Sequence, residues 1–338
     1  MRYIGGKAKL IDEIESFILS KVEVHENQRF LDLFSGTGIV AKHFKKYFEV
    51  VTNDSLYFSY ILSKGHVIPN TPPSFAKLQQ NLAIIDPLTY LNNLSGVLGF
   101  ISQNYSSDGN GRMYLTSKNA KKIDAIRMTL NQWLKDGLLE IDEFEYLLAT
   151  LIEAVPYVSN ITGTYGAYLK HWDKRALKDI VLNHPILFDN NKANVAFNDR
   201  AEKLTETIRA DICYIDPPYN NRQYTANYHL LETIAKYDSP ELRGVTGIRT
   251  FEKNENSDFC KKSKVYDAFK TVLSQVDCQH LFISYSADGL LSKEQIEEIL
   301  LSLGKPSTYD FKAIAYRLYK SKIVLKPQVD EYLFYIGK

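Results

Sequence analysis

Four consecutive residues, Asp216-Pro217-Pro218-Tyr219, combine groups that suit chemistry on an amino group attached to a flat ring. They follow the apolar, β-prone residues 211–215, so the sequence predicts a buried strand that ends in this motif. The prolines carry no N–H, which leaves carbonyl oxygens as acceptors beside an acceptor-only carboxylate. We expect Tyr219 to be exposed and to stack on an unstacked base. The alternative is a strand that ends in a proline turn with a core tyrosine.

A second group of residues predicts a nucleotide-binding turn. A strand over 29–33 leads into Phe34-Ser35-Gly36-Thr37-Gly38, and a second strand over 49–53 ends at Asp54. Glycines let a ligand approach the backbone, and an acid at the tip of the second strand can accept both ribose hydroxyls. Asp54 could instead cap a helix or form a turn. Ala41 breaks the three-glycine dinucleotide pattern, which disfavours a nicotinamide enzyme without excluding it.

The remaining hydrophobic pattern predicts an α/β fold with a mostly parallel sheet. Further strands are expected over 194–197, 212–215 and 280–285, and helices over 8–21, 39–47 and 292–303. Two late strands, over 311–319 and 332–336, have no helix between them and predict an antiparallel pair. The expected division is a catalytic domain of residues 1–57 and 186–338 with a mainly helical insertion over 58–185.

Four motifs occur in one order along the chain: residues 2–7 (Arg-Tyr-Ile-Gly-Gly-Lys), residues 32–38, Asn53-Asp54 and Asp216 to Tyr219. Together they resemble the D12-class, Dam-type DNA N6-adenine methyltransferases, and the resemblance spans nearly the whole chain. It implies a Rossmann-like methyltransferase sheet, S-adenosylmethionine as the methyl donor, and a helical insertion that recognises the target. It extends to a terminal strand at residues 331–334, whereas residues 158–169 match the family only loosely.

The resemblance also implies roles for single residues. The Asp216 carboxylate and the Pro217 carbonyl would hold the adenine N6, Pro218 and Tyr219 would complete the catalytic group, and the methyl would transfer by direct in-line displacement to a flipped adenine. No metal is expected. The residues that would line the cofactor are Tyr3, Gly5, Lys7, Phe34, Ser35, Gly36, Asp54, Asp199 and Asp216.

The residues that contact DNA are expected in two polar stretches after the catalytic motif. Residues 220–229 are rich in amides and aromatics, and residues 240–265 have the glycines and basic residues of a DNA-contacting loop or hairpin. An active-site lid and an ordinary solvated face are the alternatives, and His229 is expected to be structural. The predicted DNA contacts are Arg222, Tyr224, Asn227, Arg249, Lys253, Lys261 and Lys262.

Composition narrows the class of protein. The 338 residues are 45% hydrophobic and 24% charged, with a net charge of +1, which is typical of a globular protein. No apolar run approaches a membrane span or a signal peptide, so we expect a cytoplasmic location and no membrane partner. Three widely spaced cysteines are expected to be free thiols.

The predicted function is site-specific adenine-N6 methylation of double-stranded DNA in restriction–modification or in an epigenetic role. A cognate restriction endonuclease is the further expected partner. N4-cytosine or RNA adenine methylation is the nearest alternative. A non-catalytic DNA-binding module on a methyltransferase scaffold is another, although such a module would be expected to lose parts of the motifs, and none is lost here.

Overall fold

The computed structural model describes residues 6–252, 255–316 and 329–338. The chain divides into two compact units. The first, called the sheet unit, comprises Lys7–Ser55, Asn190–Gln223 and Asn254–Lys338. The second, called the helical unit, comprises Met1–Gly6, Leu56–Asp189 and Tyr224–Lys253.

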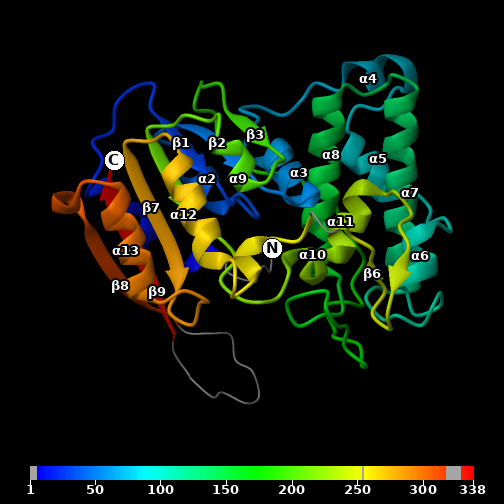
Figure 1. The fold of residues 1–338 in the computed structure, drawn as a ribbon. Helices are drawn as coiled ribbons and strands as arrows, with labels where there is room; N and C mark the ends of the chain where they lie inside the picture. The colour runs from blue at the N-terminus through cyan, green and yellow to red at the C-terminus, as the bar shows by residue number, and fades with distance from the viewer. Residues whose placement is uncertain (1–5, 253–254, 317–328) are drawn as a thin grey trace. The chain divides into compact units, whose positions relative to one another are not determined.

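The sheet unit contains a mixed sheet of seven strands in the order β3-β2-β1-β4-β7-β9-β8. Strands β3, β2, β1, β4 and β7 pair in parallel, whereas β9 is antiparallel to both β7 and β8. This confirms the predicted fold class, with its antiparallel C-terminal pair (Figure 1). The strands are β1 (Arg29–Asp32), β2 (Glu49–Asn53), β3 (Val195–Phe197), β4 (Ile212–Ile215), β7 (His280–Ser286), β8 (Asp310–Tyr316) and β9 (Val329–Gly337).

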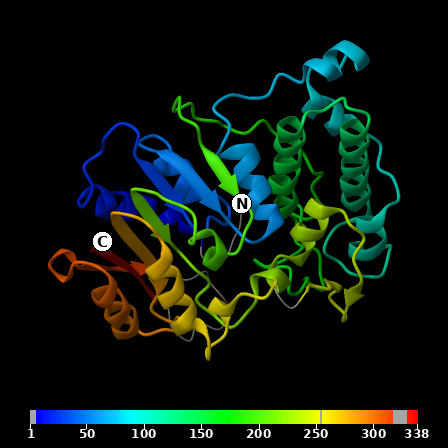
Figure 2. The same ribbon diagram turned by 45° about the horizontal axis from the view of Figure 1, so that its top comes forward.

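Helices cover both faces of this sheet because alternate residues of each strand point to opposite faces. The helices of the sheet unit are α1 (Ile11–Leu19), α2 (Ile39–Phe44), α9 (Ala201–Leu204), α12 (Val265–Gln275) and α13 (Lys293–Leu303). On one face, Cys213 and Ile215 of β4 share an apolar core with α12 and α13, which lie over the near side of the sheet in both views (Figure 1 and Figure 2). On the other face, Tyr214 stacks on Phe30, and Phe30 stacks on Phe44 of α2.

Several predicted elements are shorter in the structure. The helix expected over 8–21 is α1, which a 3-10 turn at Lys7–Lys9 precedes, and the helix expected over 39–47 ends at Phe44. The strand expected over 311–319 is β8, which ends at Tyr316, and residues 317–319 lie outside the described part of the chain. Element ends depend on caps and tertiary contacts that local periodicity does not encode.

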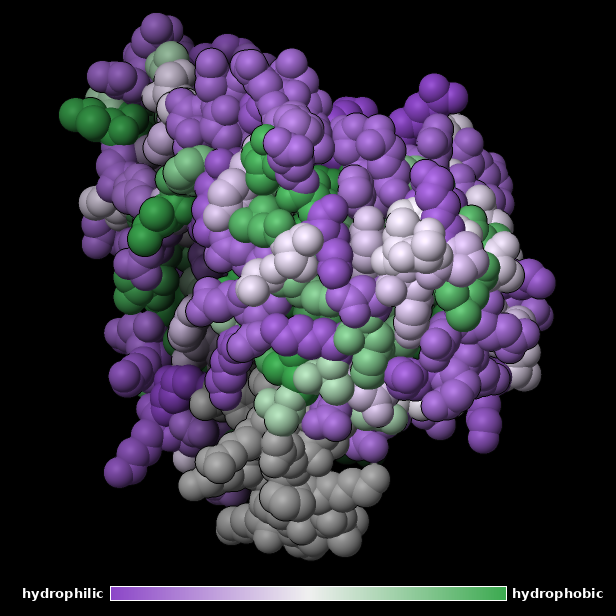
Figure 3. Space-filling model, turned by 90° about the vertical axis from the view of Figure 1, so that its left-hand side faces the viewer, coloured by the Kyte–Doolittle hydropathy of each residue, from purple (hydrophilic) through white to green (hydrophobic). Residues whose placement is uncertain are grey.

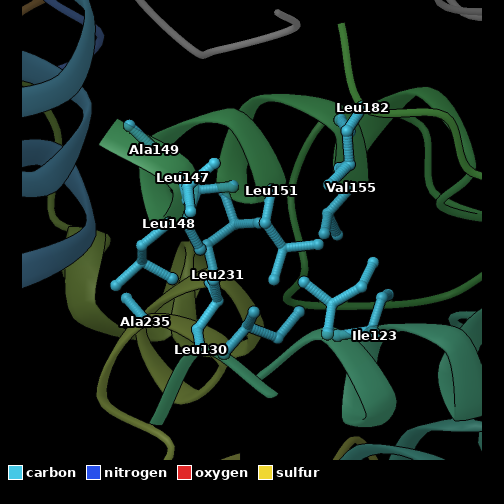
Figure 4. Packing of buried hydrophobic residues seen from close by; sticks show 14 of the residues in the cluster. Ile123, Leu130, Leu147, Leu148, Ala149, Leu151, Val155, Leu182, Leu231 and Ala235 are labelled. Atoms are coloured by element: carbon cyan, nitrogen blue, oxygen red, sulfur yellow. The ribbon is translucent and has the colours of Figure 1, made fainter. Parts of the chain in front are cut away.

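The helical unit is built around α3, α7, α8 and α11. Figure 4 shows Leu147, Leu148 and Leu151 of α8 directed toward Leu130 of α7 and Leu231 of α11. Each such buried side chain contributes roughly 1.5–3 kcal/mol of apolar transfer free energy. The elements are α3 (Tyr57–His66), α4 (Ala76–Leu82), α5 (Pro87–Asn93), α6 (Phe100–Tyr105), α7 (Ser117–Lys135), α8 (Ile141–Ala154), a 3-10 turn (Val155–Tyr157), α10 (Tyr224–Asn227), α11 (His229–Lys236), β5 (Leu242–Arg243) and β6 (Ile248–Arg249).

The structure corrects one predicted boundary, because Tyr224–Lys253 belongs to the helical unit and not to the sheet unit. The reason is packing. The apolar side of α11 is buried in the helical core, and Glu232 of α11 accepts the backbone N–H groups of Tyr57 at 3.2 Å and Phe58 at 3.0 Å. Those N–H groups begin α3 and have no partner within their own helix, so α11 supplies the cap that α3 needs.

The bulk features of the described residues concern membrane spans, cysteines and surface hydropathy. No helix among them is long and apolar enough to cross a bilayer. All three cysteines, Cys213, Cys260 and Cys278, are buried free thiols, as predicted. The surface in Figure 3 is mostly hydrophilic, with apolar residues scattered across it.

Candidate active site

The glycine turn is fixed to the end of β2 by two hydrogen bonds. Gly36 and Gly38 adopt left-handed backbone angles, with φ of 52° and 72°, which side chains with a Cβ rarely adopt. The Gly36 N–H donates to Oδ2 of Asp54 at 2.9 Å, and the Ser35 N–H donates to the Asn53 carbonyl at 2.9 Å. The predicted turn and the predicted acid are therefore brought together.

Acidic side chains dominate the electrostatics around this turn. Asp32, at the end of β1, is 1% exposed and accepts the Ala41 N–H at 3.2 Å. Burial raises the pKa of Asp32 to about 8, against the lowering effect of that hydrogen bond, and the carboxylates of Asp216 and Asp54 raise it further. Such a site favours a ligand that carries positive charge.

Asp216, which is half-buried, is held in an ion triad with the buried side chains of Lys7 and Glu331. Nζ of Lys7 lies 2.8 Å from Oδ1 of Asp216 and 3.0 Å from Oε1 of Glu331. Burial lowers the pKa of Lys7, but the two carboxylates outweigh burial and hold it well above its usual value. Burial raises the pKa of Asp216 to about 7, with Lys7 opposing and Glu331 adding to the rise. Lys7 therefore binds the catalytic motif itself.

The rest of the motif, residues 217–219, follows β4 directly. Pro217 is buried, and Pro218 and Tyr219 are half-buried. The structure corrects the expectation of an exposed Tyr219, because its ring packs against the apolar core of the sheet unit. Its carbonyl accepts the Leu290 N–H at 3.0 Å, which fixes the turn after the prolines.

The other predicted cofactor residues lie at the same edge of the sheet. Phe34 is half-buried and meets Phe259 edge to face, with ring centroids 5.0 Å apart. The Ser35 hydroxyl is buried and has no hydrogen-bond partner among the described residues. Asp199 follows β3, where its N–H donates to Oδ1 of Asn53 at 3.1 Å and its carboxylate pairs with Lys203 at 2.7 Å. Tyr3 and Gly5 lie outside the described residues.

Comparison with known families decides where this chain belongs. Residues 3–299 match the model of the D12 class N6 adenine-specific DNA methyltransferases, which is most of the chain and includes the glycine turn, Asp54 and residues 216–219. The chain belongs to this family. The resemblance inferred from its motifs is confirmed.

Named relatives of this D12-class chain are modification methyltransferases. It is 49% identical to the Type II methyltransferase M.FokI of Planomicrobium okeanokoites over 343 residues, which cover 100% of this chain and 53% of the relative. It is 44% identical to the modification methylase StsI of Streptococcus sanguinis, covering 100% of this chain and 52% of that protein. The Type II methyltransferase M.NlaIII of Neisseria lactamica is 38% identical to this chain, and the match covers 95% of this chain and 93% of the relative. The chain thus spans about half the length of the first two relatives.

The predicted DNA contacts of this D12-class chain separate into two groups. In the sheet unit, Arg222 and Lys262 are exposed, whereas Lys261 pairs with Asp258 at 2.6 Å. Gln223 holds their loops together, because its side chain exchanges hydrogen bonds with the Ser257 backbone at 3.1 and 2.9 Å. Arg222 and Lys262 therefore present charge to solvent.

In the helical unit, the structure corrects two predicted contacts. Arg249 is 6% exposed and forms a two-point pair with Asp238 at 3.1 and 2.6 Å, so its charge is used within the fold. Asn227 is 5% exposed, and its carbonyl accepts the Tyr165 N–H at 2.7 Å. Tyr224 is half-buried against the helical core, and Lys253 lies outside the described residues.

His229 is structural, as predicted. It is fully buried, and its Nε2 lies 2.9 Å from the Tyr165 carbonyl. Burial lowers its pKa to about 4, although the hydrogen bond with Tyr165 raises it. The imidazole is therefore neutral near neutral pH and joins α11 to the loop that holds Tyr165.

Sequence reasoning missed the acceptor roles of Glu331 and Asp32. Glu331 is an acid at the start of an otherwise apolar, aromatic strand, and Asp32 is an acid inside the run Phe30-Leu31-Asp32-Leu33. A buried acid needs a partner, so a charge within an apolar strand is the signal that could have found both.

Proposed function

We propose that this chain transfers a methyl group from S-adenosylmethionine to N6 of an adenine in DNA, so that the S–CH3 bond breaks, an N–CH3 bond forms and the amine loses one proton. The observation that carries the proposal is the state of Asp216. Its Oδ1 is bound by Lys7, while its Oδ2 forms no hydrogen bond with any other described residue. One carboxylate oxygen at the carboxyl end of β4 is thus left to accept an amino group.

The residues at this edge suit the proposed cofactor. S-adenosylmethionine carries a sulfonium and an ammonium. Asp54 and the ionised form of Asp216 lie at this turn, and the protonated Asp32 can lose its proton when a cation binds beside it. The Ser35 hydroxyl supplies a buried polar group without a partner among the described residues, and the left-handed Gly36 keeps the turn free of a side chain. When bound, the cofactor supplies an electrophilic methyl group.

The chain's own residues would prepare the adenine amine. Its nitrogen is a weak nucleophile because the lone pair is delocalised into the ring. Oδ2 of Asp216 and the Pro217 carbonyl would accept its two N–H groups, which directs the lone pair toward the methyl group. The half-buried Tyr219 would contact the face of the base and offset part of the unstacking cost, which is a few kcal/mol. Most of the rate enhancement would come from positioning and preorganised acceptors.

Lys7 would keep Asp216 in the form that this chemistry requires. Only the ionised carboxylate offers acceptors on both oxygens. With the pKa of Asp216 raised to about 7 by burial, the ammonium 2.8 Å away supports the charged state. We therefore expect activity to fall as the pH drops below about 7.

The substrate and partner assignments rest on the family and on the named relatives. Membership of a DNA adenine methyltransferase family supports double-stranded DNA as the substrate. The names of M.FokI and StsI as a Type II methyltransferase and a modification methylase support a role in restriction–modification, with a cognate endonuclease as partner. The helical unit is proposed as the target-recognition part, and a cytoplasmic location stays a prediction.

A product digest tests the proposed function. The full chain is incubated with unmethylated genomic DNA and methyl-labelled S-adenosylmethionine, the DNA is hydrolysed to nucleosides, and the labelled nucleoside is identified by mass. We expect N6-methyladenosine in its deoxy form, and single-molecule sequencing then locates the modified positions. Label in N4-methylcytosine, or no label in the DNA, would overturn the assignment.

A further inference from the structure

Glu331 reaches the catalytic edge from a strand that runs in the opposite direction to β4. Because β9 is antiparallel to β7, its first residues lie beside the last residues of β7, where Ser286 pairs with Glu331. The carboxyl end of β7 is also the end at which β4 delivers Asp216, since β4 and β7 are parallel. Topology therefore brings a second carboxylate to the edge that carries the first.

The side chain of Glu331 is fixed by two polar contacts. Its Oε1 accepts the Ser284 hydroxyl at 2.5 Å and lies 3.0 Å from Nζ of Lys7. The Glu331 side chain is only 9% exposed and that of Lys7 is 4% exposed, so water competes little for these contacts. A buried charge that loses its partner is costly, and this arrangement leaves Lys7 few alternatives to Glu331 and Asp216.

We propose that Glu331 is a positioning residue for methyl transfer: it holds the Lys7 ammonium on Oδ1 of Asp216, so that Oδ2 stays directed to the substrate amine. This inference rests on the proposed function and extends it to a residue outside the catalytic motif. Without Glu331, the Lys7 ammonium keeps one carboxylate partner and can bind both oxygens of Asp216. The acceptor for the amine would then be lost.

The charge of Glu331 has a separate, measurable effect on Asp216. Both carboxylates contact one ammonium, so their oxygens lie within about 6 Å of each other, where like charges disfavour joint ionisation. The titratable groups around Asp216 are Lys7, Glu331, Tyr214 and, across the turn, Asp32. Removal of the Glu331 charge therefore lowers the pKa of Asp216.

Two substitutions separate geometry from charge. Glu331→Gln keeps an oxygen that accepts from Lys7 but removes the negative charge, whereas Glu331→Ala removes both. Asp330→Asn is the matched control, because Asp330 is exposed, adjacent in sequence and on the opposite side of β9. Ser284 is left unchanged in all variants.

Methyl transfer is the first readout. We expect Glu331→Ala to lower kcat about tenfold or more, with the cofactor KM within about threefold of wild type, since only positioning is lost. Glu331→Gln should recover part of kcat and move the acid limb of kcat/KM to lower pH by roughly 0.5–1 unit. Asp330→Asn should change neither kcat nor the acid limb of kcat/KM. Wild-type kcat in Glu331→Ala, or an unmoved acid limb in Glu331→Gln, would overturn the proposal.

A second readout needs no substrate. The pKa of Asp216 is followed in the full chain by carbon-13 NMR of labelled aspartate carboxyls, with its signal identified by its loss in Asp216→Asn. Its midpoint should fall in Glu331→Gln and stay constant in Asp330→Asn. An unchanged midpoint in Glu331→Gln would show that the two carboxylates are not coupled and would overturn the inference. If the wild-type chain failed to methylate adenine, the proposed function would fail, while this titration would still decide whether Glu331 acts on Asp216.

Discussion

Oδ2 of Asp54 accepts the backbone N–H of Gly36 at 2.9 Å, so one carboxylate joins the end of β2 to the turn that follows β1. The same Gly36 holds a left-handed conformation with φ of 52°, which glycine adopts without steric cost. A change at Asp54 therefore acts on the proposed cofactor site in two ways: it removes a charge, and it releases the turn.

The first prediction concerns cofactor affinity. We expect Asp54→Ala to raise the Kd for S-adenosylmethionine about tenfold or more, and Asp54→Asn to raise it less, because asparagine can still accept from Gly36. Isothermal titration calorimetry measures the Kd of both variants. Glu26→Gln, at an exposed acid of the same unit, serves as the control and should bind like wild type. Equal affinity in Asp54→Ala and wild type would remove Asp54 from the site.

The second prediction concerns protons released on cofactor binding. Burial raises the pKa of Asp32 to about 8 and that of Asp216 to about 7, so both are partly protonated near pH 7 in the free chain. A cationic ligand lowers both pKa values, and protons must leave. Calorimetry in buffers of different ionisation enthalpy should show net release at pH 7, smaller in Asp32→Asn. Net uptake, or no exchange, would contradict the cationic-ligand model.

The third prediction concerns stability against pH. The pKa of Asp32 in the folded chain is raised above its ordinary value of 3.8 to about 8, so the protonated form is favoured by folding. Its contribution to the free energy of unfolding is complete below the ordinary value and is lost as the pH rises toward 8. Asp32→Asn should flatten the fall in stability between about pH 5 and 8, leaving the part due to Asp216.

Urea unfolding at several pH values provides the measurement, and Asp330→Asn, which changes an exposed acid, is the matched control. The control should keep the wild-type pH dependence. A free energy of unfolding that falls between pH 5 and 8 to the same extent in Asp32→Asn and wild type would refute a protonated, buried Asp32.

The fourth prediction separates Arg222 from Arg249. Arg222 is exposed, so Arg222→Ala should weaken DNA binding and reduce the salt dependence of the affinity by about one counterion. Arg249 is buried on Asp238, so Arg249→Ala should lower the free energy of unfolding by about 1–3 kcal/mol and leave the salt dependence unchanged. Binding isotherms at several salt concentrations and urea unfolding test the pair. The reverse pattern would restore Arg249 as a phosphate contact.

Local sequence patterns predicted the elements whose structure depends on residues close together in the sequence. The strand before Asp216, the glycine turn at Gly36 and the acid at Asp54 each follow from residues within one element and its connection, and all three lie where a parallel sheet should place them. The antiparallel C-terminal pair was predictable because no helix separates its strands.

Long-range partners could not be predicted in the same way. Lys7 and Glu331 lie at opposite ends of the chain, and only the order of β4, β7 and β9 brings them together. The sequence around Arg249 is typical of a surface cation, and only the fold places Asp238 beside it. In the same way, only the fold places the apolar core against Tyr219. In each case the deciding contact is tertiary and has no local sequence pattern.

The proposed chemistry depends on Asp216 as the acceptor that activates the adenine amine. The most direct measurement is the single-turnover rate of methyl transfer by Asp216→Ala on DNA, with cofactor affinity measured in parallel and Asp330→Asn as the control. We expect loss of methyl transfer by a factor of about a thousand or more, with cofactor binding weakened only partly. Retention of a substantial rate at full cofactor occupancy would contradict it.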